Sequence, residues 1–164
     1  MSQDVGGATI MALAKDAALA AMETLGAGDE IGIISFEDTS TWAIQSTPAD
    51  QVDAISAVDK MPPGGGDDTL AGALQLGYGG LHGIQARVKH EVVITDGETP
   101  SGDHAALVQQ MQAEGMSVST IGIGEQADTQ QLQQLARAGG GAYYDGSHPF
   151  DLPLAATTGR HLTK

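Results

Sequence analysis

Short, strongly apolar runs alternate with helical patterns along this chain, and that alternation limits the fold more than any other feature. Residues 30–36 (EIGIISF), 91–95 (EVVIT) and 117–123 (SVSTIGI) are rich in β-branched side chains. Continuous runs of this kind are typical of parallel strands that are buried on both faces. Residues 39–45 instead alternate like an antiparallel neighbour, and residues 141–144 predict a short last strand.

Helical segments are expected between these strands, at residues 8–25, 48–61, 69–81, 103–114 and 132–138. Within the second of them, Val52, Ile55 and Val58 are predicted to form the inner stripe. Strands that alternate with helices throughout predict an α/β fold with a doubly wound, mostly parallel sheet, helices on both faces and one antiparallel edge strand. The 164 residues suit a single domain, with a disordered tail over residues 151–164.

The balance of charge narrows the classes of partner. Lys and Arg number 7 against 21 Asp and Glu, which gives a net charge of −14. Nucleic acids and anionic membrane surfaces would repel such a chain. The sequence has no cysteine, which excludes disulfides, thiolate zinc sites and cysteine nucleophiles. No run approaches the roughly 20 apolar residues that span a bilayer, and no secretory signal opens the chain, so the compartment stays open.

Carboxylates follow the predicted strands, at the edge of the sheet where α/β folds bind ligands. They are Glu37, Asp38, Asp96, Glu98, Glu125 and Asp145. The glycine-rich loop over residues 64–68 is expected to reach the same edge. Oxygen ligands that converge there suit a hard cation such as Mg²⁺. For Asp67 and Asp68 an alternative is that they only cap the following helix.

Patterns of enzymatic chemistry are missing. The sequence contains neither the G-x-S-x-G turn of α/β-hydrolases nor the phosphate-binding G-x-x-x-x-G-K-[ST] loop. Its five histidines lack the spacing H-E-x-x-H, which favours surface or core roles for them. An enzyme is therefore the weaker hypothesis.

Five segments together resemble the von Willebrand factor type A domain, including its bacterial forms. They are DEIGIISFED, MPPGGGDDTLAGALQLG, VVITDGET, VSTIGIGEQAD and LARAGGGAYYD, in that order along the chain. The resemblance implies a Rossmann-like fold and a metal-ion-dependent adhesion site. In the family, a D-x-S-x-S motif after the first strand, a Thr of the glycine-rich loop and an Asp after the fourth strand hold the cation. Asp96 matches the last position, and either Asp68 or Thr69 matches the loop position.

The D-x-S-x-S motif and the first strand of the family are absent from the sequence, as though the chain began just after them. The resemblance places that strand at the centre of the sheet. Without it, two strand edges are expected to lack a backbone partner. The two halves then close up, another chain or a second copy supplies the strand, or the domain is only marginally stable. Adding the strand is expected to raise the melting temperature.

The resemblance implies a non-enzymatic protein-interaction domain of the adhesion or scaffold type, with an incomplete metal site. An acidic side chain of the partner would complete the coordination of Mg²⁺ or Mn²⁺. With Asp96 and only Asp68 or Thr69 remaining, the cation is expected to bind no tighter than about millimolar. The alternatives are a small Mg²⁺-dependent phosphoryl-transfer enzyme that uses Asp96 and Asp68, and a structural subunit without metal.

Overall fold

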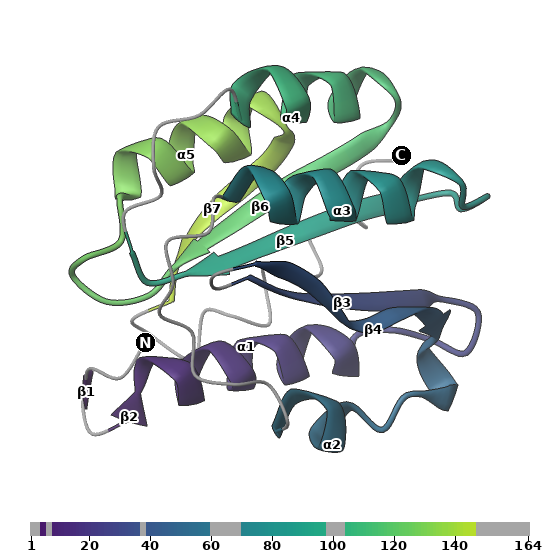
Figure 1. The fold of residues 1–164 in the computed structure, drawn as a ribbon, viewed down its shortest axis with the longest axis horizontal. Helices are drawn as coiled ribbons and strands as arrows, with labels where there is room; N and C mark the ends of the chain where they lie inside the picture. The colour runs from purple at the N-terminus through teal and green to yellow at the C-terminus, as the bar shows by residue number, and fades with distance from the viewer. Residues whose placement is uncertain (1–3, 6–7, 37–38, 60–69, 98–103, 147–164) are drawn as a thin grey trace.

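A three-stranded parallel sheet forms the centre of the molecule (Figure 1). The computed structural model describes residues 4–5, 8–36, 39–59, 70–97 and 104–146. The sheet has the order β5 (Lys89–Thr95), β6 (Met116–Gly122) and β7 (Gly140–Asp145), and both pairings are parallel. Six of the seven residues of β6 are buried, because this strand has a neighbour on each edge and helices on each face.

A second sheet pairs β3 (Glu30–Phe36) with β4 (Ser40–Pro48) in antiparallel orientation. The predicted antiparallel strand is thereby confirmed, and so is its alternation between exposed and half-buried residues. In Figure 1, β3 and β5 run in the same direction, but no ladder joins them. The described strands thus form two separate larger sheets. A short antiparallel pair of β1 (Asp4–Val5) and β2 (Ala8–Thr9), which the sequence pattern did not predict, precedes them.

Helices cover both faces of the parallel sheet, as expected of a doubly wound fold. On one face, α1 (Ile10–Glu23) packs Ile10, Leu13 and Ala17 against Ile121 and Ile123. On the other face lie α3 (Leu70–His82), α4 (His104–Ala113) and α5 (Thr129–Ala138), whose buried side chains form a second core with β5 and β6. The short α2 (Ala54–Asp59) packs against α1. The helices therefore sandwich the parallel sheet.

The predicted helix over residues 48–61 is wrong in its extent and in its buried face. A 3₁₀ turn at Ala49–Gln51 ends at Val52, whose φ of −94° and ψ of 120° are extended, and α2 begins only at Ala54. This break changes the phase of the helix. Val58 is buried at 1% exposure, but Ile55 is 64% exposed. Residues 60 and 61 lie outside the described residues.

The prediction that residues 30–36 are buried on both faces is also wrong. None of the seven residues of β3 is fully buried, and Ile31, Ile33, Ile34 and Phe36 are half-buried. Within the described part of the chain β3 pairs along one edge only, with β4. A composition typical of a central strand therefore occurs on a strand with an open edge.

Candidate functional site

The three parallel strands end level with one another, which creates a single carboxyl edge. Thr95, Gly122 and Asp145 are aligned across β5, β6 and β7. Hydrogen bonds continue this alignment past the strands: the Ile123 N–H donates to the Thr95 carbonyl at 2.9 Å, and the Gly146 N–H donates to the Gly122 carbonyl at 2.8 Å. Side chains that follow these strands are therefore placed by a rigid backbone frame.

Asp96 is the predicted metal ligand that the structure places at this edge. It follows the last residue of β5 and is half-buried. The preceding residue, Thr95, is 5% exposed, and its Oγ1 accepts a hydrogen bond of 3.4 Å from the Gly97 N–H. The turn after β5 is thus held from within the sheet.

The loop positions Asp68 and Thr69 lie outside the described residues, as do Asp67, Glu37, Asp38 and Glu98. The structure does describe Leu70, which begins α3 directly after them and is 1% exposed in the core. In Figure 1, α3 begins above the same end of the sheet at which β5 ends. The beginning of α3, which directly follows the loop, therefore lies at the end of the sheet where β5 ends and Asp96 follows.

The other carboxylates near this edge do not add a metal centre. Glu125 is exposed, and Asp128 caps α5, where its Oδ1 accepts a hydrogen bond of 2.9 Å from the Gln131 N–H. Over residues 4–5, 8–36, 39–59, 70–97 and 104–146, no three His, Asp or Glu side chains gather closely enough to hold a metal ion. The described residues supply one of the three predicted ligands, and one carboxylate cannot fix the octahedral geometry that Mg²⁺ requires.

A buried polar pair at the beginning of β5 was missed by sequence reasoning. The Glu91 Oε2 and His90 Nε2 atoms are both shielded from solvent and have no hydrogen-bond partner among the described residues. Burial raises the pKa of Glu91 to about 8, and it lowers the pKa of His90. The His90 Nδ1 lies 2.6 Å from the Ser117 Oγ. Successive strand residues face opposite sides, so the pair does not share one pocket.

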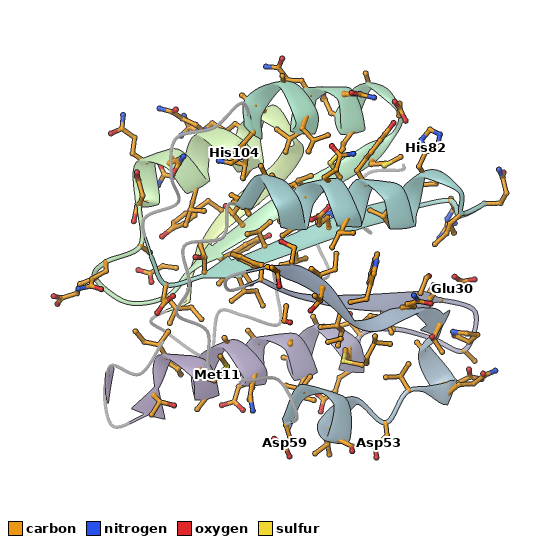
Figure 2. The ribbon with its side chains drawn as sticks, viewed as in Figure 1. Met11, Glu30, Asp53, Asp59, His82 and His104 are labelled. Atoms are coloured by element: carbon orange, nitrogen blue, oxygen red, sulfur yellow. The ribbon has the colours of Figure 1, made fainter. Side chains whose placement is uncertain are left out.

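An exposed polar cluster joins α3 to α4, and it shows what one of the scattered histidines does. The Tyr78 hydroxyl donates to the Glu114 carboxylate at 3.1 Å, and the Gln110 Nε2 donates to both of these groups. The His82 Nδ1 lies 2.9 Å from the Glu114 Oε2. The hydrogen bond from Gln110 is the main cause that lowers the pKa of Glu114, and the bonds from Tyr78 and His82 add to it. Figure 2 shows His82 at the far end of α3 from the carboxyl edge, where its exposed side chain has one of the two roles, surface or core, predicted for the histidines.

The chain belongs to the von Willebrand factor type A domain family, whose model matches residues 1–153. Domains of this family mediate protein interactions and are generally non-enzymatic, and some hold a divalent cation at a metal-ion-dependent adhesion site. No curated protein matches the sequence. None of the described helices combines the length and hydrophobicity that crossing a bilayer demands.

Solved structures share the fold at low sequence identity. A von Willebrand factor type A protein from Catenulispora acidiphila is 23% identical with a TM-score of 0.75, over 91% of this chain and 38% of that one. The conserved hypothetical protein BatB from Bacteroides thetaiotaomicron is 18% identical with a TM-score of 0.79, over 96% and 91%. Proximal thread matrix protein 1 from the mussel byssus, with a zinc-occupied adhesion motif, is 18% identical with a TM-score of 0.68, over 90% and 41%. The chain thus spans less than half the length of the first and third.

Proposed function

We propose that this domain binds a protein partner at the carboxyl edge of its parallel sheet, through a weakly held divalent cation that Asp96 and either Asp68 or Thr69 coordinate. An acidic side chain of the partner would complete the coordination. The observation that supports the proposal is the position of Asp96, directly after β5 at the edge where α3 begins. Oxygen ligands at such an edge favour Mg²⁺ or Mn²⁺.

The affinity for the cation should be low. Mg²⁺ usually retains several waters and accepts one or two carboxylates, and a site with few preorganised ligands leaves its geometry to those waters. We therefore infer a degenerate site whose occupancy depends on the partner carboxylate. Zinc occupies the adhesion motif of the mussel protein, which supports a cation in this family without assigning one to this chain.

The phosphoryl-transfer alternative has no observation in its favour. Lys15 donates from its Nζ to the Asp59 carbonyl at 3.1 Å, which holds it between α1 and α2. Lys89 opens β5 at the opposite end of the strand from Asp96. Neither of these lysines can meet a phosphate at the carboxyl edge.

Calorimetric titration with Mn²⁺ tests the metal site. The wild-type domain should bind Mn²⁺ no tighter than about millimolar, and Asp96→Ala should abolish this binding while the circular dichroism spectrum stays unchanged. Separate Asp68→Ala and Thr69→Ala variants identify the loop ligand. Asp16→Ala, which changes an exposed carboxylate of α1, is the matched control and should bind Mn²⁺ like the wild type. Binding that survives Asp96→Ala would refute the assignment, and micromolar binding that Asp96→Ala abolishes would show that the site is complete.

A further inference from the structure

The outer surface of α4 and α5 carries no carboxylate. Its exposed residues are three Ala, one Thr, one Arg and five Gln, namely Gln109, Gln110, Gln112, Gln130 and Gln134. Seven of the 13 glutamines of the chain lie within the 20 residues of these two helices, which contain no Asp, Glu or Lys. In a chain with 21 Asp and Glu, this part of the surface is therefore depleted of charge and enriched in amides.

The two helices form one continuous face. They pack on each other and lie together at one extreme of the molecule, with α1 and α2 at the opposite extreme (Figure 1). Gln110 is engaged within the domain, because its amide donates to Tyr78 and Glu114. The other exposed glutamines form no hydrogen bond with another described residue. We call these four side chains the amide face: Gln109, Gln112, Gln130 and Gln134.

Charged groups lie around the amide face but not on it, apart from Arg137 near the end of α5. At the ends of the two helices, Glu114 accepts the hydrogen bond from Gln110, and Asp128 accepts one of 2.9 Å from the Gln131 N–H. Figure 2 shows the exposed Asp59 on α2, at the opposite extreme of the molecule. A basic partner would be attracted to the exposed carboxylates, and the net charge of −14 would repel an acidic one. The amide face therefore fits a partner surface that is uncharged.

This chain supplies such a surface itself. A side-chain amide both donates and accepts hydrogen bonds, so an array of amides can pair with an identical array. A twofold interface brings a patch against its own copy and must be self-complementary. Carboxylates or ammonium groups would repel each other in that arrangement, whereas amides do not. Depletion of charged residues is also the compositional signal of the core of a protein interface.

We propose that two copies of this chain associate through the amide face, with α4 and α5 of one copy packed on α4 and α5 of the other about a twofold axis. Each helix has 10 residues, so the face is about 15 Å long and about 20 Å wide. A face of this size lies at the low end of protein interfaces, so the dimer is weak and reversible, with a Kd of about 0.1 mM. Asp96 is not part of the amide face, so the contact does not require a metal ion.

Sedimentation equilibrium of the full chain at about 10 µM to 1 mM, with EDTA present, tests the proposal. The wild-type mass should rise from 16.7 kDa toward twice that value. The double variant Gln109→Glu/Gln134→Glu keeps the size of both side chains but places a carboxylate on each helix, and should raise the Kd at least about tenfold. The matched control Gln45→Glu/Gln51→Glu adds the same charge at exposed positions of β4 and the 3₁₀ turn. Its Kd should stay within about twofold of the wild-type value, because these positions lie outside the face.

A charge swap identifies the face as the contact. The double variant Gln109→Lys/Gln134→Lys should also dimerise more weakly than the wild type, because like charges then meet across the twofold axis. An equimolar mixture of the Glu and Lys variants should associate at least about tenfold more tightly than the Glu variant alone. Circular dichroism should show the same fold for all variants.

Three results would overturn the proposal. A wild-type protein that stays monomeric at 1 mM forms no such dimer. A dimer that both charged variants leave unchanged has its contact elsewhere, for example at strand edges. An equal loss of dimer in the Gln45→Glu/Gln51→Glu control would show an effect of net charge alone.

Discussion

At the scale of single residues, Glu30 and Glu91 show what sequence can and cannot predict. Glu30 is the first residue of the run 30–36, and Glu91 is the first residue of the run 91–95; both runs are rich in β-branched residues. The sequence pattern therefore predicts similar surroundings for the two side chains. In the structure Glu30 is exposed and accepts a hydrogen bond of 2.8 Å from the Ser46 hydroxyl, whereas Glu91 lies against Gly77 beneath α3. The difference arises from the packing of a distant helix, which local spacing does not encode.

Asp96 illustrates the opposite case. A carboxylate directly after a buried strand is expected at the carboxyl edge from the sequence alone, and the structure places it there because the strand ends in register with its neighbours. Its role as a metal ligand remains a prediction. The candidates for the loop ligand, Asp68 or Thr69, lie outside the described residues.

Glu91 should make the stability of the domain depend on pH. Its pKa is raised to about 8 by burial, from an ordinary value of 4.5, so the folded protein keeps a proton that the unfolded chain releases. Raising the pH from 4.5 to 8 therefore favours unfolding, and above 8 the effect is constant. Glu91→Gln removes this dependence. The free energy of unfolding of the variant relative to the wild type should rise by about 2–4 kcal/mol between pH 5 and pH 9.

Urea unfolding of both proteins at pH 5, 6, 7, 8 and 9 measures this difference. The matched control is Glu23→Gln, which changes an exposed carboxylate at the end of α1 and should give a constant difference over the same range. His90 acts in the opposite sense, because its pKa is lowered and stability is lost as the pH falls below 6.5. His90 is present in all three proteins and cancels in the comparison. Parallel curves for the wild type and Glu91→Gln would contradict the prediction.

At the scale of elements, the spacing of apolar residues predicts that a helix or strand exists better than it predicts which of its residues are buried. Apart from the segment 48–61, the predicted helices and strands that fall on described residues are found, with ends shifted by a few residues. The segment 48–61 fails because the extended Val52 resets the helix, and nothing in the apolar spacing marks that break. The register of β7 is also not predictable from spacing. Where β7 pairs with β6, the register shifts between Val118 and Thr120.

Gly141 of β7 should tolerate no side chain at this shift. A Cβ atom there would overlap the Val118 carbonyl oxygen and lie 2.6 Å from the Ser119 Oγ, which already accepts a hydrogen bond of 3.1 Å from the Ala142 N–H. Backbone atoms of a central strand cannot move aside without loss of the ladder. Gly141→Ala should therefore lower the free energy of unfolding by about 1–3 kcal/mol, measured by urea unfolding.

The control is another glycine with open space around it. Gly79 lies in α3, and a Cβ atom there would meet no atom within 4 Å. Gly79→Ala should stabilise the domain by about 0.5–1 kcal/mol, because Ala is a better helix former than Gly. If Gly141→Ala were as stable as the wild type, the close approach of β7 to β6 would not hold in solution.

At the scale of the whole molecule, the alternation of strands and helices predicts the fold class, and the separate β3–β4 and β5–β6–β7 sheets agree with the two unpaired strand edges that the family resemblance predicted. The parallel strands and both helical layers were predicted, and the structure confirms them. Residues 30–36 and 117–123 are both rich in β-branched residues, so composition alone does not distinguish β3, paired on one edge, from β6, paired on both. Burial reveals the difference, since β6 is buried almost throughout and β3 is not.

This division should appear in the local stability of the domain. The fully buried apolar residues of β-strands belong to β5 and β6, and neither β3 nor β4 contains a fully buried residue. Opening the β3–β4 ladder therefore exposes less apolar surface than opening β6, and regions with few buried contacts open at lower free energy.

In native-state hydrogen exchange, the ladder amides of β3 and β4 should exchange at least about a hundredfold faster than those of β6, after correction for intrinsic rates. Only amides bonded within each ladder are compared, because amides on an open edge exchange fast in any case. Equal opening free energies for β3, β4 and β6 would mean that the two sheets unfold as one cooperative unit, and that α3, which packs on both, couples them fully.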